Sequence, residues 1–243
     1  MIDFRFVYRG LRAQYRDQKY EIRSMLSALK ADDTALDVGC NKGSYLWALS
    51  HAVPRGRVIA FEPQPVLVDY LNQACARSGL RNVTIEGAGV SSTSGALRLA
   101  VPGGGASSPG ASFEAAVAAR ETCRFIDVPT YALDSYFLDR PVQRIGAIKI
   151  DVEGHEMSVL AGAQAILERH RPVVVCECEQ RHMSSGSVSD LFKLFRDLRY
   201  SGYFAQHGAA TPVEQFAPAV HQKQIGERFW DAKDYFNNFV FFP

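Results

Sequence analysis

The chain has 243 residues, with 27 Lys and Arg against 26 Asp and Glu, so its formal net charge is +1. Hydrophobic residues make up 47% and charged residues 22%, a composition that excludes an intrinsically disordered or fibrous protein. The near-zero charge argues against a nucleic-acid partner held mainly through phosphates, because there is no excess of basic side chains to displace counterions. We therefore expect a soluble, globular protein of the size of one α/β domain, without a nucleic-acid partner.

Targeting and cysteine signals both point to a cytoplasmic location. No apolar run approaches the ~20 residues that a membrane span needs, and residues 1–5 lack the apolar core of a signal peptide. The five cysteines are odd in number and have no Cys-x-x-Cys spacing, which favours neither zinc nor a disulfide framework. Cys176 and Cys178 lie in a strand-like run, and we interpret both as small core residues.

The first half of the chain alternates between strand and helix patterns. Residues 11–30 carry apolar side chains at helical spacing. After them, strands are predicted over 35–38, 58–61 and 82–85, and helices over 44–51 and 65–78. This βαβαβ order predicts a parallel sheet with right-handed crossovers and with helices on both faces.

The middle of the chain interrupts this alternation. Predicted strands over 97–101 and 125–128 flank a Gly-rich stretch at 102–110, which is expected to be a mobile loop. The loop is either a linker within a surface hairpin or a lid over a substrate. The alternation then resumes, with strands predicted over 145–152, 172–179, 203–206 and 238–242, and helices over 156–169 and 188–198.

No internal repeat or domain boundary is evident, so we expect a single domain over residues 1–243. Residues 1–34 would form an N-terminal helical extension and residues 35–200 the core. Residues 201–243 would supply C-terminal strands and a segment on the substrate side.

A Gly-rich turn between the first core strand and the next helix predicts a nucleotide-type cofactor site. Gly39 allows a sharp turn, and the following helix points its free N–H groups toward a ligand. The dinucleotide pattern GxGxxG is absent, because Asn41 stands between Gly39 and Gly43. Asp37 would repel a pyrophosphate and suit a cationic ligand such as S-adenosylmethionine, although it could also be a simple turn residue.

Further cofactor contacts are predicted at the next two strand ends. Glu62 lies 25 residues after Asp37 at the end of the second strand, where an acid can accept hydrogen bonds from ribose hydroxyls. Pro63 follows it, and Gly87 and Ala88 follow the third strand, where small residues would admit an adenine ring. The simpler alternatives are that Glu62 is a solvated loop acid and that the small residues only shape a turn.

A second cluster of ionisable residues is predicted at the end of the 145–152 strand. Lys149, Asp151 and Glu153 alternate onto one face of this buried strand, which is costly unless the charges are paired or functional. His155 follows at the start of the next helix. An ion pair between Lys149 and Glu177 of the neighbouring strand is the purely structural alternative.

These residues suggest two kinds of chemistry, which the sequence does not separate. His155 is a candidate general base, and Asp151 could orient His155, bind a cofactor ammonium or act as the base itself. Alternatively, Asp151, Glu153, His155 and Glu177 could together hold Mg²⁺ or Mn²⁺ and acidify a substrate hydroxyl.

Several segments resemble the FkbM-type S-adenosylmethionine-dependent methyltransferase family. They are residues 36–43, 61–63, 88–91 and 133–134, the Lys-x-Asp-x-Glu-Gly-His-Glu run at 149–156, and Leu160-x-Gly162-Ala163. The resemblance covers roughly residues 37–200, and the run at 149–156 is its most specific part. It implies a Rossmann-like class I methyltransferase fold, with a seven-stranded, mostly parallel sheet and helices on both faces. Residues 238–242 could supply the reversed last strand.

The resemblance implies an O-methyltransferase, because family members methylate hydroxyls of macrolides and of sugars in surface glycans. The expected acceptor is therefore a hydroxyl of a sugar, a glycan or a polyketide-type small molecule, with Lys149, Asp151, Glu153 and His155 as catalytic candidates. The Gly-rich 102–110 stretch and the region after residue 200 depart from the family pattern, so acceptor contacts do not carry over. Two alternatives are a catalytically weak cofactor-binding scaffold and an NAD(P)-dependent oxidoreductase. Asp37 and the missing GxGxxG pattern argue against the oxidoreductase.

Overall fold

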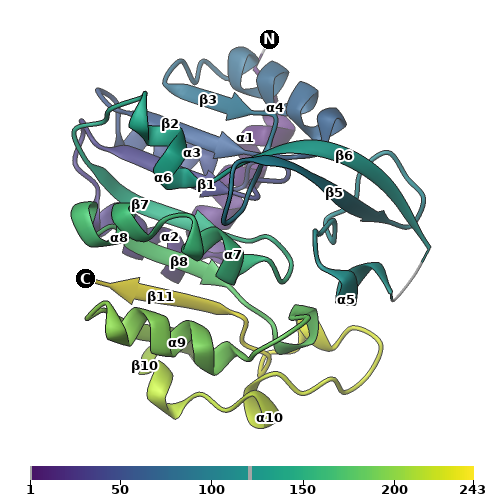
Figure 1. The fold of residues 1–243 in the computed structure, drawn as a ribbon. Coiled ribbons are helices and arrows are strands. Elements are labelled where there is room, and N and C mark those ends of the chain that lie inside the picture. The colour runs from purple at the N-terminus through teal and green to yellow at the C-terminus, as the bar shows by residue number, and fades with distance from the viewer. Residues whose placement is uncertain (1, 120–121) are drawn as a thin grey trace.

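The computed structural model describes residues 2–119 and 122–243 (Figure 1). The chain opens with helix α1 (Phe4–Arg12), a π-helical segment (Ala13–Asp17) and helix α2 (Lys19–Ala28). The single helix predicted over 11–30 is thus wrong in its start and its continuity. Gln18 interrupts it because its φ of −129° leaves the helical region. Gly10 lets α1 approach helix α3 (Leu46–Ala52), since a Cβ there would lie 2.5 Å from Trp47 Cβ.

The core is an eight-stranded sheet with the order β10-β9-β11-β8-β7-β1-β2-β3. Its strands are β1 (Thr34–Val38), β2 (Arg57–Phe61), β3 (Val83–Glu86), β7 (Ile145–Ile150), β8 (Val173–Glu177), β9 (Ser201–Gln206), β10 (Ala209–Pro212) and β11 (Asn238–Phe242). The neighbours from β8 to β3 are parallel, and β11 is antiparallel to both β8 and β9. The expected seven strands with a reversed last strand are present, and β10 adds an eighth strand at the edge.

Helices cover both faces of this sheet (Figure 1). One face packs against α1, α2, α3 (Leu46–Ala52) and α4 (Pro65–Arg77). The other packs against α6 (Leu133–Leu138), α7 (Glu156–Ala161), α8 (Gln164–His170) and α9 (Val188–Asp197). Strand β1 shows why both faces are covered: Ala35 belongs to the first cluster, whereas Leu36 and Val38 belong to the second. Alternate side chains of one buried strand therefore require two apolar layers.

Between β3 and β7 the chain forms an insert with its own sheet. Strands β4 (Gly89–Val90), β5 (Gly95–Pro102) and β6 (Cys123–Tyr131) form it in the order β4-β6-β5, and the short helix α5 (Ala115–Ala118) lies in the β5–β6 connection. β5 and β6 are antiparallel, so the predicted strands at 97–101 and 125–128 are confirmed, in a longer form. The insert lies beside the end of the sheet where β1, β2 and β7 finish (Figure 1).

The helix predicted over 156–169 is wrong, because the chain forms α7 and α8 instead. The break lies at Gly162, where a Cβ would be 2.2 Å from the carbonyl oxygen of Ser91. The Asp134 backbone N–H donates to the Gly162 carbonyl at 2.8 Å. The Asp134 carboxylate accepts from the backbone N–H groups of Ala165 and Ile166, both at 3.0 Å, at the start of α8. These hydrogen bonds cap the start of α8, so a second helix begins there and α7 does not continue.

The remaining short elements follow β8 and β10. They are the 3₁₀ turns Gln180–His182, Val213–Gln215 and Phe229–Asp231, and helix α10 (Pro218–His221). Within the described residues, none of the five cysteines forms a disulfide, and Cys176 and Cys178 are buried in the core as predicted. Within residues 2–119 and 122–243, every helix is too short or too polar to cross a bilayer.

Candidate active site

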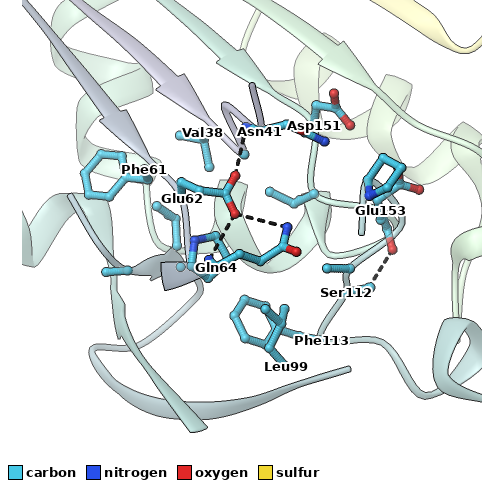
Figure 2. Close-up of a pocket in the computed structure, with 18 residues that line it drawn as sticks. Val38, Asn41, Phe61, Glu62, Gln64, Leu99, Ser112, Phe113, Asp151 and Glu153 are labelled. Carbon is cyan, nitrogen blue, oxygen red and sulfur yellow. Dashed lines mark hydrogen bonds between the residues drawn. The ribbon is translucent and has the colours of Figure 1, made fainter. Parts of the chain in front are cut away.

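A pocket lies where β1, β2 and β7 end, beneath the insert (Figure 2). It contains roughly 510 Å³ of empty space, a volume that includes open solvent at its mouth. Its lining comes from three strand ends and from the insert. The lining residues are Val38, Gly39, Asn41, Phe61, Glu62, Pro63, Gln64, Ala88, Gly89, Val90, Leu99, Pro109, Ala111, Ser112, Phe113, Asp151, Val152 and Glu153.

The turn after β1 is shaped as predicted, although the reason for its glycine differs. Gly39, Asn41 and Gly43 have φ values of +75°, +47° and +75°. A Cβ at Gly39 would lie 1.8 Å from the carbonyl oxygen of Asp151, so glycine is needed for the contact between the ends of β1 and β7. Gly39 and Asn41 line the pocket, whereas Gly43 packs against side chains of α1, α3 and α4.

Glu62 is a buried carboxylate on the pocket wall. Only 2% of its surface is exposed. Its Oε2 accepts from the backbone N–H of Asn41 at 2.8 Å, and its Oε1 accepts from the backbone N–H and the Nε2 of Gln64 at 3.0 and 3.2 Å (Figure 2). Burial raises the pKa of Glu62, and these hydrogen bonds oppose the rise. A carboxylate offers about four acceptor positions, so Oε2 retains one for a ligand.

The other walls are small or apolar. Pro63 and Ala88 line the pocket, as predicted for the strand ends. Gly87 lies outside the lining, and a Cβ there would be 3.7 Å from Val68, an ordinary contact. The larger apolar lining residues are Val38, Phe61, Val90, Leu99, Phe113 and Val152. Such a surface suits a flat, weakly polar ring.

Asp37 and Lys149 lie beneath the turn rather than in the pocket. The exposed fraction of Asp37 is 0% and that of Lys149 is 6%. Lys149 Nζ donates to the Gly39 carbonyl at 2.9 Å and lies 3.5 Å from Asp37 Oδ1 and 3.1 Å from Asp151 Oδ2. Burial raises the pKa of Asp37, and Lys149 opposes the rise. Burial disfavours the ammonium, but the Asp151 and Asp37 carboxylates raise the pKa of Lys149.

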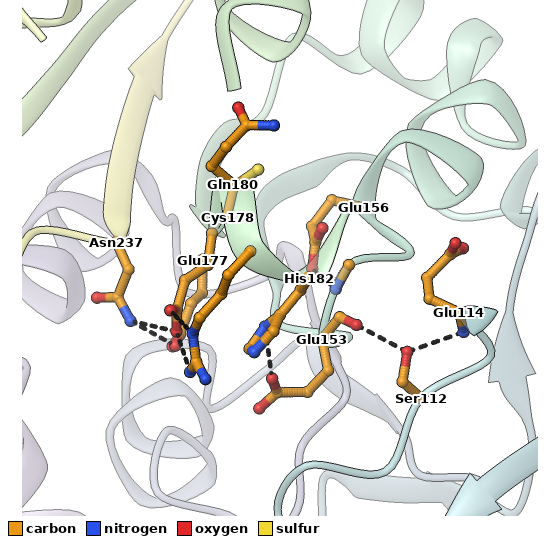
Figure 3. A network of polar contacts seen from close by, with 12 residues as sticks. Ser112, Glu114, Glu153, Glu156, Glu177, Cys178, Gln180, His182 and Asn237 are labelled. Atoms are coloured by element: carbon orange, nitrogen blue, oxygen red, sulfur yellow. Dashed lines mark hydrogen bonds and ion pairs between the residues drawn. The ribbon is translucent and has the colours of Figure 1, made fainter. Parts of the chain in front are cut away.

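This geometry corrects two expectations. Asp37 does not face the cofactor pocket, because its carboxylate is enclosed with Lys149. The ion pair considered between Lys149 and Glu177 is also wrong for the part of the chain that is described. Lys149 pairs with two aspartates, and Glu177 Oε1 instead accepts from Asn237 Nδ2 at 2.7 Å (Figure 3).

His155 does not pair with Asp151. Its Nδ1 contacts Glu114 Oε1 at 2.7 Å and its Nε2 contacts Ser91 Oγ at 2.9 Å. The ring is 8% exposed, lies edge-on to Phe113 and is outside the pocket lining. Because both ring nitrogens are occupied, His155 ties helix α7 to the insert and braces the Phe113 wall.

Glu153 pairs with a histidine that the sequence analysis does not single out. Its Oε2 lies 2.9 Å from His182 Nδ1 (Figure 3). Glu153 has a φ of +53°, uncommon for this residue type, and a Cβ at Gly154 would lie 2.3 Å from the His182 carbonyl oxygen. The turn after β7 is therefore shaped against His182. Burial raises the pKa of Glu153, and the His182 hydrogen bond opposes the rise.

The contact between Glu153 and His182 fixes the tautomer of the His182 ring. An ionised carboxylate only accepts hydrogen bonds, so the proton of a neutral His182 ring lies on Nδ1 and the lone pair on Nε2. Within the described residues, Nε2 has no hydrogen-bond partner. It is not one of the fully buried unpaired polar atoms, so it keeps some contact with solvent. His182 follows the end of β8, and the rule that ligands bind beyond the carboxyl ends of parallel strands could have identified it.

Among the described residues, the four possible metal ligands do not come together as one metal site. Across the described ranges, no group of three or more His, Cys, Asp or Glu side chains is arranged to hold a metal ion. Of the four candidates, His155 is paired with Glu114, Glu153 with His182, and Asp151 with Lys149. Glu177 is held by Asn237.

The insert supplies pocket residues that no motif predicts. Pro109 of the Gly-rich 102–110 stretch belongs to the wall, as do Ala111, Ser112 and Phe113 directly after it. Gln64 also lines the pocket and was not singled out. Its position two residues after Glu62 was the available signal, since it opens helix α4 at the same strand end.

Glu156, in the first turn of α7, gives a pH-dependent prediction. Its Oε1 accepts from the Gly154 backbone N–H at 2.9 Å, and burial raises the pKa of Glu156 to about 8. The folded state therefore keeps a proton that the unfolded chain releases near pH 4–5. Stability should fall as pH rises from 5 to 8, by up to about 4 kcal/mol relative to Glu156→Gln, which keeps an oxygen for Gly154. Urea unfolding at several pH values tests this, and parallel curves would contradict it.

Comparison with known proteins supports the resemblance seen in the sequence. The Methyltransferase FkbM domain family model matches residues 37–203. The methyltransferase sdnD of Sordaria araneosa is 30% identical over 186 residues, which cover 66% of this chain and 69% of that protein. The hexuronic acid methyltransferase AglP of Haloferax volcanii is 29% identical over 166 residues, covering 66% of this chain and 62% of that protein.

Solved structures share the fold. Methyltransferase FkbM from Methylobacillus flagellatus superposes with a TM-score of 0.53 at 17% identity, covering 88% of this chain but only 44% of that one. The O-methyltransferase of Bacillus cereus in complex with SAH gives a TM-score of 0.52 at 14% identity, covering 98% and 87%. The architecture is thus that of class I methyltransferases. With a family model that spans residues 37–203 and the strand-end pocket described above, the chain belongs to the FkbM methyltransferase family.

Proposed function

We propose that the protein is an S-adenosylmethionine-dependent O-methyltransferase acting on a hydroxyl of a sugar, a glycan or a polyketide-type small molecule. The observation that carries this proposal is the buried Glu62 carboxylate, which has one open acceptor position in a pocket that also has apolar wall residues such as Phe61 and Phe113. Ribose hydroxyls donate to such a carboxylate, and the apolar walls suit adenine. The SAH complex of the structurally similar Bacillus cereus enzyme is consistent with this cofactor.

The charges of the pocket favour a cationic ligand over a phosphate. Its formally charged lining residues are the carboxylates Glu62, Asp151 and Glu153. The Asp151 side chain is 27% exposed, and its Oδ2 is held by Lys149, which leaves Oδ1 for an ammonium donor. Carboxylates would repel the pyrophosphate of a dinucleotide, so this lining argues against the NAD(P) alternative.

The proposed reaction needs a methyl donor and a base. When bound, S-adenosylmethionine supplies a methyl group on a positively charged sulfur. The acceptor oxygen forms a bond to the methyl carbon as the carbon–sulfur bond breaks, and the hydroxyl proton must move to a base. We assign the base to His182 Nε2, because Glu153 holds Nδ1 and no described residue occupies the lone pair on Nε2. His155, with both nitrogens occupied, holds the insert instead.

The positions of the other catalytic candidates suggest supporting roles. Lys149 neutralises Asp37 and Asp151 and fixes the turn at Gly39. Asp151 faces the cofactor, and Glu153 positions His182. Among the described residues, these side chains do not form a metal site, and we assign no step of the reaction to a metal.

Cofactor identity is testable by thermal unfolding. A ligand at 100 times its dissociation constant stabilises the folded state by about 2.7 kcal/mol. For a chain of this size, S-adenosylmethionine or S-adenosylhomocysteine should therefore raise Tm by about 5–10 °C, and NADH should not. A shift with NADH and none with the adenosyl ligands would overturn the proposal.

The acceptor class needs a transfer assay. Suitable probes are p-nitrophenyl β-D-glucoside, which offers only hydroxyls, and p-nitrophenyl β-D-glucuronide, which adds a carboxylate. The glucuronide is included because AglP is described as a hexuronic acid methyltransferase. We expect a methyl ether that survives alkaline hydrolysis. A product that alkali cleaves would be an ester and would contradict transfer to a hydroxyl, and cofactor binding without transfer would favour the scaffold alternative.

A further inference from the structure

A short segment of the insert, residues 108–113, crosses over the pocket, and we call it the strap. Pro109, Ala111, Ser112 and Phe113 belong to the pocket lining. The strap is held at Ser108 and at the Ser112 side chain, on opposite sides of the pocket, and the Ser112 backbone also exchanges two hydrogen bonds with Ala100 of β5 at 2.9 and 3.0 Å. Ser108 is bound to Gln64 beyond the end of β2, and Ser112 Oγ donates to the Glu153 carbonyl at 2.7 Å beyond the end of β7 (Figure 2). A ligand beneath the strap is therefore enclosed from above.

The contact at Ser108 uses the whole side-chain amide of Gln64. Gln64 Nε2 donates to the Ser108 carbonyl at 3.0 Å, and the Ser108 backbone N–H donates to Gln64 Oε1 at 2.8 Å. The same Nε2 also donates to Glu62 Oε1 at 3.2 Å, and the exposed fraction of Gln64 is 4%. One buried amide thus joins the carboxylate proposed to bind the cofactor to the strap that covers it.

The segment before the strap is built to move. Gly103 and Gly104 have φ values of +77° and +66°, a region that glycine adopts readily. A Cβ at either residue, or at Gly110, would have no neighbouring atom within 4 Å. With so few packing contacts, this segment is held by polar contacts, which are the bond from Arg124 Nη2 to the Ala106 carbonyl at 3.1 Å and the Gln64–Ser108 pair. Within the strap itself, Gln64 fixes this end at Ser108.

We propose that Gln64 is a latch that holds the strap closed and thereby limits the rate at which the cofactor enters and leaves the pocket. Opening requires the two Gln64–Ser108 hydrogen bonds to break while the glycine segment changes conformation. Glu62 keeps its bonds from the Asn41 and Gln64 backbones, so the carboxylate stays in place when the strap opens. The inference rests on the proposed S-adenosylmethionine site for its ligand, but the latch itself rests on the contacts above.

Two variants break the latch in different ways. Gln64→Ala removes the amide and leaves the backbone N–H bond to Glu62. Ser108→Pro removes only the backbone N–H that donates to Gln64 Oε1 and does not touch Glu62. Ser107→Pro is the matched control, because it places a proline one residue earlier, where the backbone nitrogen has no hydrogen bond to any described residue.

The first readout is the dissociation rate of S-adenosylhomocysteine, measured by stopped-flow displacement. We expect Gln64→Ala and Ser108→Pro to dissociate the ligand about tenfold faster, since each loses one or two hydrogen bonds of the closed state, and Ser107→Pro to stay near the wild-type rate. Unchanged rates in both latch variants, with S-adenosylhomocysteine still bound, would overturn the latch and leave the proposed function intact.

The second readout needs no ligand. Proteinase K should cleave the 103–111 stretch of the ligand-free protein faster in Gln64→Ala and Ser108→Pro than in Ser107→Pro or the wild type. Equal cleavage in all four proteins would overturn the latch even if the wild type bound no adenosyl ligand. If the wild type did not bind S-adenosylhomocysteine, the cofactor proposal would fail on that measurement, separately from the latch. Melting temperatures measured in parallel identify any variant whose cleavage reflects global unfolding.

Discussion

Replacing Glu62 with alanine is expected to weaken S-adenosylmethionine binding about 100-fold. The substitution removes the carboxylate that would accept the ribose hydroxyls, and hydrogen bonds to a charged group contribute about 1.5–3 kcal/mol each. A loss of about 2.8 kcal/mol corresponds to a factor of 100 in Kd. It also leaves the Asn41 backbone N–H without its acceptor and so loosens the turn after β1. Isothermal titration calorimetry with S-adenosylhomocysteine measures the change.

Glu86→Ala is the matched control for this experiment. Glu86 is the last residue of the neighbouring strand β3, but it accepts from Tyr136 Oη at 2.7 Å and lies outside the pocket lining. Its removal should change the affinity by less than a few fold. Equal losses in both variants would mean that the effect comes from general damage to the strand ends, and an unchanged affinity in Glu62→Ala would refute the proposed ribose contact.

Replacing His182 with glutamine is expected to lower kcat by about 10²–10⁴, the usual contribution of a general base. The affinity for S-adenosylhomocysteine should stay near that of the wild type, because His182 lies outside the pocket lining. A protonated imidazole cannot accept a proton, so kcat/KM of the wild type should rise with pH as the base loses its proton. That rise should disappear in the variant. Initial rates on whichever glycoside probe the wild type methylates test both points.

Two further variants separate a base from a structural residue. Glu153→Gln keeps the shape but loses the carboxylate that orients the ring, so we expect an intermediate fall in kcat with the pH dependence displaced. His155→Gln disturbs the brace between Ser91 and Glu114, and any loss of rate there should retain the wild-type pH dependence. If the pH dependence vanished in His155→Gln and persisted in His182→Gln, the base assignment would be reversed.

Local sequence signals located the parts of the site that depend on strand ends. A strand followed by Gly39 and Asn41 places a turn at the carboxyl end of β1, and Glu62 directly follows β2. Neighbouring parallel strands end on the same side of a sheet, so both features had to meet. The same reasoning placed Asp151 and Glu153 beyond β7, where they line the pocket.

The register between β1 and β7 decided which residues Asp37 and Lys149 contact. The two residues are directly opposite each other on β1 and β7, whereas Lys149 is opposite Val175 on β8. Lys149 therefore meets Asp37 rather than Glu177, and Asp37 is enclosed instead of facing the ligand. Both strands are buried on both faces, so their hydrophobic pattern does not specify which residues pair.

Contacts between segments far apart in the sequence decided the partners of the histidines and the position of the strap over the pocket. His155 meets Glu114, 41 residues earlier in the insert, and Gln64 meets Ser108, 44 residues later. Neither pair has a local pattern, because the insert's position over the strand ends follows from packing of the whole domain. The break at Gly162 likewise depends on the approach of Ser91.

The sequence by itself determined the alternation of strands and helices, the turn at Gly39 and the acid after β2, because each depends on periodicity or on short-range chain chemistry. The reversed direction of the last strand was expected only from the resemblance to the FkbM family. Only the tertiary structure decided which charges pair, which histidine keeps a lone pair and what covers the pocket. Those outcomes depend on strand register and on contacts between segments tens of residues apart, and the local pattern of residues is the same for several such arrangements.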